Sequence, residues 1–175
     1  EKRNGQIILG DIHNLDNLIP VGVQFSLIIS PCNTFCSFPP KSRKKILGVI
    51  ASRLTRRGCF AAALPNPALL WQYPHQAEAE VEDIFPHPLS GNPVQVSSAW
   101  RRTSRRFILR WIYDHLLPNG EVERFEVCTT QYFSSLQGYC EELIGAGLTK
   151  INAYGDFDGS AYCEESPELI LVAWP

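Results

Sequence analysis

The first third of the chain alternates short apolar runs with one amphipathic stretch. Residues 6–11, 25–30 and 59–64 are strand-sized and almost continuously apolar, which is typical of strands buried on both faces of a parallel sheet. Between the last two runs, residues 42–57 carry apolar side chains at helical spacing. Ser42 is the predicted N-cap of this helix, and Gly58 fits the left-handed position that follows a helix. The order predicts a βαβ unit with a right-handed crossover.

The middle of the chain has a different pattern. Residues 71–92 contain several prolines and an acidic patch at 78–83, which predicts a loop with one helical turn. Residues 94–100, 106–115 and 121–132 follow as three strand-like segments. Pro118-Asn119-Gly120 joins the last two, and Asn-Gly is a strong hairpin signal. The pattern predicts an antiparallel insertion of two or three strands, in which Phe107, Leu109, Trp111 and Tyr113 share one face.

The last part of the chain returns to the first pattern. Ser134 or Ser135 is expected to cap a helix with the stripe Leu136, Tyr139, Cys140, Leu143 and Ile144. A strand over 148–154, a turn-rich loop over 155–160 and a final strand over 168–174 follow. We therefore expect an α/β fold in one domain over residues 1–175. Its core is a Rossmann-like, mostly parallel sheet, with the antiparallel hairpin insertion at about 71–132.

Composition and charge narrow the functional classes. The 175 residues are 45% apolar, as in globular proteins, and the net charge of −2 gives no general attraction to nucleic acid or to an anionic membrane. No apolar run reaches the roughly 18 residues of a membrane span. The N-terminus lacks the shape of a signal peptide, and the sequence contains no methionine. These features predict a fragment or a processed form.

The six cysteines are expected to be free thiols. Cys59, Cys128 and Cys140 lie within apolar segments, as buried thiols often do. Cys32 and Cys36 are four residues apart, but no second pair follows at zinc spacing. A reducing, cytoplasmic location is the expectation.

A series of short motifs runs along the chain: Ile8-Leu9-Gly10-Asp11-Ile12, the segment 27–35 ending in Asn33-Thr34-Phe35, Asn66-Pro67, Tyr132-Phe133-Ser134, Gly145-Ala146-Gly147-Leu148, and 154–160 followed by Ser166-Pro167. This ordered set resembles the C-terminal portion of class I S-adenosylmethionine-dependent methyltransferases of the small-molecule type. The set covers nearly the whole chain, and residues 71–92 match least. Arg57-Gly58 stands where that family has Gly-Gly, and the family's glycine-rich turn and ribose-binding acidic residue would lie upstream of Glu1.

The resemblance implies S-adenosylmethionine as cofactor and a small molecule as methyl acceptor. It assigns no catalytic residue, because methyl transfer depends chiefly on alignment of the two reactants. No metal, nucleic acid or membrane is implied, and the oligomeric state stays open. The implied cofactor-binding residues are Asp11, Ile12, Ser30, Pro31 and Cys32, and the implied substrate-binding residues are Asn33, Phe35, Trp111 and Tyr113.

Each implied role has a plainer alternative. Asp11 could cap a local turn, Phe35 could pack in the core, and the aromatic stripe of residues 107–113 could be the buried face of a hairpin. His13 could act as a base or be a solvated loop residue. Arg110 lies beside the stripe on the insertion, which could cover the acceptor site.

The remaining charged clusters are expected to be structural or solvated. Asp156 and Asp158 should bond their local backbone, and no calcium site is expected there. Two other functions compete with the methyltransferase: a catalytically inactive methyltransferase-like chain that serves as a binding or scaffold module, and a nucleic-acid-binding α/β domain that uses the arginines. The clusters expected to be solvated are Lys41, Arg43, Lys44 and Lys45 on a helix face, and Arg101, Arg102, Arg105 and Arg106 with Trp100 at a hairpin turn.

Overall fold

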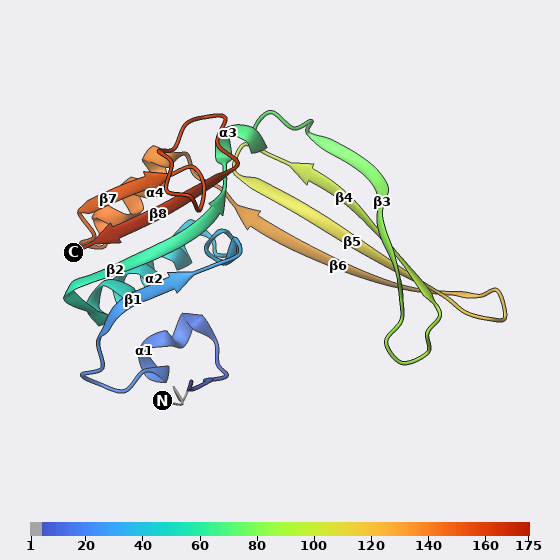
Figure 1. The fold of residues 1–175 in the computed structure, drawn as a ribbon, viewed down its shortest axis with the longest axis horizontal. Coiled ribbons are helices and arrows are strands. Elements are labelled where there is room, and N and C mark those ends of the chain that lie inside the picture. The colour runs from blue at the N-terminus through green and yellow to red at the C-terminus, as the bar shows by residue number, and fades with distance from the viewer. Residues whose placement is uncertain (1–4) are drawn as a thin grey trace. The chain divides into compact units, whose positions relative to one another are not determined.

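The computed structural model describes residues 5–175, and the chain divides into two compact units (Figure 1). Unit 1 combines the N-terminal part of the chain up to Asn66 with Ser134–Pro175. Unit 2 is the continuous segment Pro67–Phe133. Each unit has its own four-stranded sheet.

The sheet of unit 1 is mixed. Its strand order is β1 (Phe25–Ser30), β2 (Leu54–Pro65), β8 (Glu168–Trp174) and β7 (Lys150–Tyr154). The β1–β2 pair is parallel, whereas β8 is antiparallel to both of its neighbours. Three of the four strands, β1, β2 and β7, therefore point in one direction, and β8 is reversed because the loop after β7 turns the chain back beside β7. The expected α/β fold is confirmed, with a mixed sheet in unit 1.

Helix α2 (Pro40–Arg53) connects the two parallel strands, which confirms the predicted βαβ unit. Its bounds differ from the expected 42–57. Pro40 occupies the first turn, where its fixed φ suits a helix start, and Leu54 is already extended. Gly58 lies inside β2 instead of ending the helix. A Cβ at Gly58 would lie 2.7 Å from the Phe25 carbonyl oxygen, so the close approach of β1 explains the glycine.

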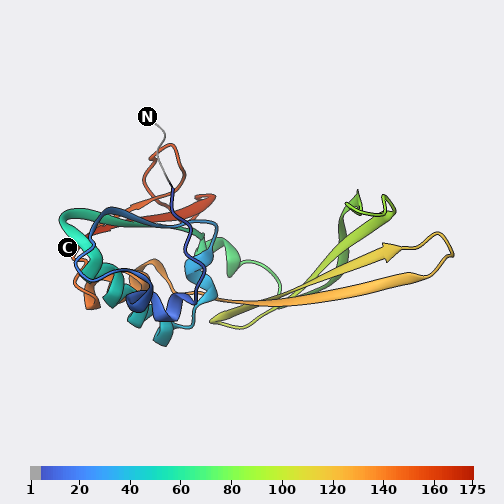
Figure 2. The same ribbon diagram turned by 90° about the horizontal axis from the view of Figure 1, so that it is seen from below.

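Helices α2 and α4 (Leu136–Gly145) cover one face of this sheet, as Figures 1 and 2 show. Ser135 caps α4 as predicted, with its Oγ accepting a hydrogen bond from the Gly138 N–H at 3.1 Å. Ile144 was expected in the buried stripe but is 52% exposed. The core between helices and sheet consists of Ile46, Leu47, Ile50, Phe60, Leu64, Tyr139, Leu143, Leu169 and Leu171.

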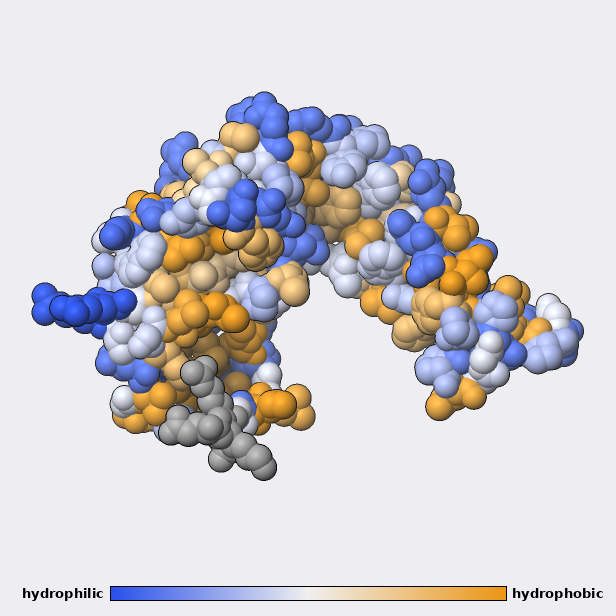
Figure 3. Space-filling model, in the orientation of Figure 1, coloured by the Kyte–Doolittle hydropathy of each residue, from blue (hydrophilic) through white to orange (hydrophobic). Residues whose placement is uncertain are grey.

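The other face of the sheet carries apolar side chains without a helical cover. Leu27 and Ile29 on β1 are 55% and 62% exposed. Figure 3 shows apolar surface over the part of the sheet formed by β1 and β2. An apolar strand in this protein is thus not always buried on both faces.

The predicted strand over residues 6–11 does not form. Ile7 and Leu9 are almost fully exposed, and the segment leads into a 3-10 turn, η1 (Ile12–Asn14), and a short helix, α1 (Leu15–Leu18). An apolar run needs a neighbouring strand to satisfy its backbone groups, and none of the described residues pairs with this run.

The sheet of unit 2 is an antiparallel meander in the order β3 (Gln76–Pro86), β4 (Pro93–Arg102), β5 (Arg106–Leu116) and β6 (Val122–Tyr132). The predicted hairpin between β5 and β6 is confirmed: the Gly120 N–H donates to the Leu117 carbonyl oxygen at 3.0 Å, and Gly120 has φ +85°. The expected loop over 71–92 is wrong, because half of it is the edge strand β3. A short helix, α3 (Pro67–Leu70), begins the unit.

All six cysteines are free. Cys128 is exposed, contrary to the expectation of a buried thiol. Within residues 5–175, no cluster of three or more His, Cys, Asp or Glu side chains could hold a metal ion. None of the described helices is long and apolar enough to cross a membrane.

Candidate functional site

The candidate site lies at one edge of the sheet of unit 1. Strands β1 and β2 are parallel, and β7 has the same direction because it is antiparallel to β8. The carboxyl ends of these three strands therefore meet at a single edge. Ligands of open α/β sheets bind in the crevice outside this edge.

The turn after β1 has an uncommon, left-handed backbone. Cys32 and Asn33 have φ of +53° and +60°, and they are the two non-glycine residues with positive φ in residues 5–175. Each such residue costs on the order of 1–3 kcal/mol and is retained where the surrounding structure holds it. Here the Asn33 N–H donates to the Ala63 carbonyl oxygen of β2 at 3.3 Å, and the Thr34 N–H donates to the Pro31 carbonyl oxygen at 3.1 Å.

This turn contains three of the predicted cofactor-binding residues and the first predicted substrate-binding residue. Pro31 and Cys32 are exposed, and Ser30 and Asn33 are half-buried. The left-handed turn therefore presents its backbone at the carboxyl edge. Sequence patterning located the turn, but only the structure shows its conformation.

The next residue of interest, Phe35, belongs to the 3-10 helix η2 (Thr34–Ser37) and is 3% exposed. Its ring lies 5.7 Å from that of Phe60 and 6.4 Å from that of Tyr139. These are the contacts of a core residue, which was the alternative to substrate binding. A direct role for Phe35 in binding stays a prediction.

The η2 segment contacts a buried ion pair between Arg43 and Glu142, which sequence analysis did not predict. The Arg43 side chain is fully buried, although it was expected on a solvated helix face. Its guanidinium donates to both Glu142 carboxylate oxygens, at 2.7 and 2.6 Å, to Ser134 Oγ and to the Phe38 carbonyl oxygen. The guanidinium also lies 5.6 Å from the Phe35 ring centroid. Arg43 thus joins α2, α4 and the turn that follows β1.

Cys36 lies in the same cluster, with its Sγ 3.5 Å from the Tyr139 hydroxyl. Burial raises the pKa of the Cys36 thiol to about 11. The thiol is therefore protonated at neutral pH and is not a nucleophile. Cys36 serves packing and not covalent chemistry.

Asp11 and Ile12 precede β1. One Asp11 carboxylate oxygen accepts hydrogen bonds from the His13 N–H at 2.9 Å and lies 2.8 Å from His13 Nδ1. This caps η1, as the alternative to cofactor binding expected, and the His13 backbone N–H holds the pKa of Asp11 below its usual range. Ile12 is half-buried. None of the described hydrogen bonds links Asp11 to the turn after β1.

At the end of β2, Asn66 anchors the loop between β7 and β8. Its side chain is buried, and its amide nitrogen donates to the carbonyl oxygens of Glu164 at 2.9 Å and Ser166 at 2.7 Å. The Tyr162 hydroxyl donates to its amide oxygen at 2.7 Å. The Asn66-Pro67 motif marked this strand end, but no sequence signal identified its partners about 100 residues away.

The same loop confirms two local expectations. Asp158 accepts from the Ser160 N–H at 2.8 Å, and this backbone hydrogen bond holds the pKa of Asp158 below its usual range. Asp156 accepts from the Phe157 N–H at 2.6 Å. Both carboxylates bond the local backbone, as the turn composition predicted.

Trp111 and Tyr113, the remaining predicted substrate-binding residues, lie on β5 of unit 2 and are half-buried. The strand register places both on the face expected for the aromatic stripe. The Tyr113 ring lies 6.4 Å from that of Phe125 on β6. Neighbouring Arg110 is exposed on the opposite face and lies 3.9 Å from Glu126. No structural observation assigns a ligand to Trp111.

Two of the clustered arginines have protein partners. The Arg102 guanidinium donates to the carbonyl oxygens of Tyr73 and Trp71, at 2.6 and 3.0 Å. The Arg106 guanidinium lies 5.7 Å from the Tyr132 ring centroid. These contacts favour the structural interpretation of the cluster over nucleic-acid binding.

The fold is similar to that of several methyltransferases of known structure. For an S-adenosylmethionine-dependent methyltransferase from Clostridium acetobutylicum ATCC 824 the TM-score is 0.74 at 11% identity, over 98% of this chain and 65% of that one. For the CcbJ methyltransferase from Streptomyces caelestis the TM-score is 0.73 at 16% identity, over 95% of this chain and 62% of that one. For DesVI from Streptomyces venezuelae the TM-score is 0.67 at 15% identity, over 95% of this chain and 63% of that one.

The likeness establishes the fold class: this chain has the α/β fold of S-adenosylmethionine-dependent methyltransferases. The chain spans less than two thirds of the length of these neighbours. No protein-family model matches the sequence. No curated protein matches it either.

Proposed function

We propose that the chain takes part in the transfer of a methyl group from S-adenosylmethionine to a small-molecule acceptor. The observation that carries the proposal is the left-handed turn at Cys32 and Asn33. It lies at the carboxyl end of β1, in a sheet with the fold of S-adenosylmethionine-dependent methyltransferases. A strained, exposed turn at this edge is suited to backbone recognition of a ligand.

The residues near this edge fit part of an adenosyl group. The Asp11 side chain is 61% exposed, and one of its carboxylate oxygens takes no part in the described hydrogen bonds. This oxygen is a suitable acceptor for the adenine exocyclic amine. Ile12 would contact the adenine ring, and Ser30, Pro31 and Cys32 would line the crevice with their backbone.

When bound, the cofactor would supply a methyl group on a positively charged sulfur. The chain has to hold the acceptor in line with that group and exclude competing water. Asn33 would lie between cofactor and acceptor. A base is needed only where the acceptor must lose a proton, and His13 is then the candidate because Asp11 orients its ring through Nδ1.

The acceptor is proposed to be a small molecule, with nitrogen as the first atom to test. Among structures of similar fold, CalS10 from Micromonospora echinaspora is an amino pentose methyltransferase, at TM-score 0.60 and 13% identity. KedS8 from Streptoalloteichus sp ATCC 53650 is a sugar N-methyltransferase, at TM-score 0.66 and 14% identity. Trp111 and Tyr113 are proposed to contact the acceptor.

Calorimetric titration with S-adenosylhomocysteine tests the proposal. Asp11→Asn should weaken binding by about 1–3 kcal/mol, roughly 5- to 150-fold, because the amide cannot accept from the adenine amine with the strength of a carboxylate. The amide can still cap η1, so the fold should persist.

Asp158→Asn is the matched control, since Asp158 is another exposed aspartate that bonds its local backbone. This variant should bind as the unsubstituted chain does. Absence of heat from the unsubstituted chain would overturn the proposed function. Equal affinity of the Asp11 variant would remove the adenine assignment while leaving the cofactor proposal.

A further inference from the structure

Unit 2 contains a pocket of about 330 Å³ that the proposed function does not use as its cofactor site. It lies where β3 and β5 end and β6 begins. The strand register explains how it forms, since directly opposed residues share a face of an antiparallel sheet. One row across the sheet is Phe85, Val94, His115 and Glu123. The next row on the same face is Val96, Tyr113 and Phe125.

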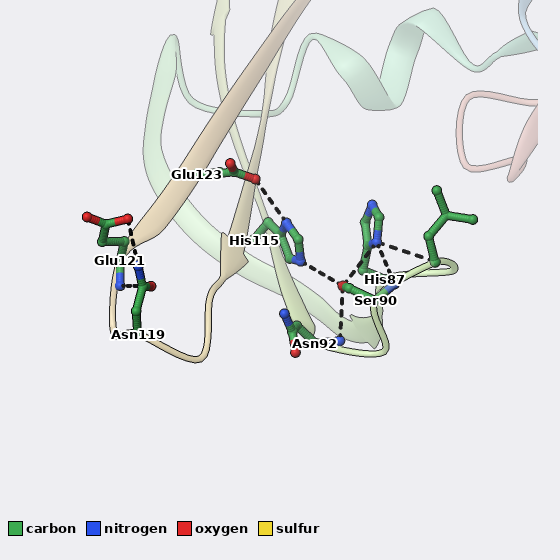
Figure 4. A network of polar contacts seen from close by, with 8 residues as sticks. His87, Ser90, Asn92, His115, Asn119, Glu121 and Glu123 are labelled. Carbon is green, nitrogen blue, oxygen red and sulfur yellow. Dashed lines mark hydrogen bonds and ion pairs between the residues drawn. The ribbon is translucent and has the colours of Figure 1, made fainter.

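A chain of polar contacts forms one wall of the pocket (Figure 4). The His87 and His115 rings stack with centroids 4.5 Å apart and an interplanar angle of 20°. Ser90 Oγ lies 3.2 Å from His87 Nδ1 and 3.0 Å from His115 Nε2. His115 Nδ1 lies 3.3 Å from a Glu123 carboxylate oxygen. These contacts connect the turn between β3 and β4 to strands β5 and β6, so this wall of the pocket is formed before any ligand binds.

The charges around the pocket do not cancel on the pocket face. Arg124 is also among the residues that line the pocket. It follows Glu123 on β6, so its side chain leaves the strand toward the opposite face of the sheet. There its guanidinium donates to both Asp114 carboxylate oxygens, at 2.7 and 2.8 Å. These hydrogen bonds hold the pKa of Asp114 below its usual range, so the pair is neutral overall at pH 7. The carboxylate of Glu123 is the formal charge that the pocket face keeps.

The aromatic side chains define the chemistry that would suit this charge. The Tyr113 and Phe125 rings are inclined at 47° with centroids 6.4 Å apart, and Phe85 lies across the sheet on β3. Ring faces attract organic cations through the aromatic quadrupole, and a nearby carboxylate adds to this attraction. An anion would instead meet the Glu123 carboxylate.

We propose that this pocket binds a small organic cation, namely a protonated or quaternary ammonium group with a short apolar body. The Glu123 carboxylate would face the cation, and Tyr113 and Phe125 would contact its alkyl groups. The volume of about 330 Å³ lies at the lower end of the range for small-molecule pockets. This inference goes beyond the proposed methyl transfer and uses residues of unit 2 alone. Tyr113 is the one residue that the pocket shares with the proposed acceptor contacts, so the variants that test the pocket are placed at Glu123 and Phe125.

Choline and its neutral isostere 3,3-dimethylbutan-1-ol provide the first test, with the 15N-labelled 175-residue chain. Choline should shift the amide resonances of Phe85, His87, Leu89 and Ser90 and of residues 113–115 and 123–125. It should bind at least about tenfold more tightly than the neutral alcohol, because the two differ in charge and hardly in shape. Equal affinity of the two compounds, or shifts by acetate at the same residues, would overturn the proposal. This test requires no substitution.

Variants test the assignment of the residues. Glu123→Gln and Phe125→Leu should each weaken choline binding by at least about fivefold. Glu121→Gln is the matched control, because Glu121 lies in the same hairpin and hydrogen-bonds Asn119 outside the pocket. Glu123 is 70% exposed, so its substitution should leave the spectrum unchanged elsewhere. Unchanged choline affinity in Glu123→Gln would contradict the proposal.

Titration with S-adenosylhomocysteine distinguishes the proposed cation site from the proposed methyl transfer. Its affinity should be the same in Glu123→Gln as in the unsubstituted chain. Failure of choline to bind would overturn the cation site alone, and failure of S-adenosylhomocysteine to bind would overturn the proposed function alone.

Discussion

Replacing Glu142 with alanine is expected to lower the free energy of unfolding by about 3–5 kcal/mol. The substitution leaves the fully buried Arg43 guanidinium without the carboxylate that accepts two of its hydrogen bonds. Taking an ion out of water without a partner carries a penalty of several kcal/mol. Urea denaturation of the 175-residue chain, followed by far-UV circular dichroism, measures the change through the shift of the midpoint.

A double variant distinguishes the net contribution of the intact ion pair to the free energy of unfolding from the cost of removing only one of its partners. Arg43→Met with Glu142→Leu should be more stable than Glu142→Ala alone, because no buried charge then remains. Asp16→Ala is the control, since it removes an exposed carboxylate from Arg53, which keeps its hydrogen bond to the Pro20 carbonyl oxygen, and it should cost at most about 1 kcal/mol. Equal destabilisation by Glu142→Ala and Asp16→Ala would contradict the account of the buried pair.

The second large effect is expected from Asn66→Asp. Aspartate has nearly the same shape as asparagine. The substitution, however, replaces the amide nitrogen that donates to the Glu164 and Ser166 carbonyl oxygens with a carboxylate oxygen, which cannot donate to them. Asn66 is 2% exposed, so the new charge would be buried and unpaired. We expect a loss of about 3–5 kcal/mol in the free energy of unfolding, measured by the same denaturation experiment.

Asn152→Asp is the matched control for this variant. Asn152 is an exposed residue on β7, and its amide nitrogen donates to the Tyr154 hydroxyl at 3.1 Å. Its substitution should change stability by no more than about 0.5 kcal/mol. If Asn66→Asp were as mild as this control, Asn66 would not be the anchor of the loop between β7 and β8.

The parts of the fold that sequence patterning predicted are those with strong local signals. The order of β1, α2 and β2 follows from an amphipathic helix between two apolar runs. The Ser135 cap and the Asn119-Gly120 turn are short signals with a direct backbone meaning, and both form as expected. Local chemistry was sufficient for this cap and this turn, whose hydrogen-bonding partners lie within a few residues.

The errors occur where a distant partner decides the structure. Residues 6–11 have the apolar pattern of a strand, but none of the described residues pairs with them. Strand β3 has the composition of a loop, yet hydrogen bonds from β4 hold it in the sheet. Arg43 stands in a basic stretch typical of a wet helix face, and Glu142, 99 residues later, draws it into the core.

The candidate site was also predictable only in part. The sequence pattern and the family resemblance predicted that residues 30–35, at the end of β1, contribute to it. They could not show the left-handed backbone of Cys32 and Asn33, because neither residue is a glycine that would indicate positive φ. The resemblance also implied that Phe35 binds substrate. Its ring contacts Phe60 and Tyr139 as a core residue does, and the binding role stays a prediction.

The central claim is that the carboxyl edge of the unit 1 sheet binds the adenosyl cofactor. The most direct measurement is a titration of the 15N-labelled 175-residue chain with S-adenosylhomocysteine, followed by amide chemical shifts. The account predicts shifts concentrated at residues 11–13, at Ser30 and at residues 32–35. Shifts confined to unit 2, or a spectrum that does not change at saturating ligand, would contradict it.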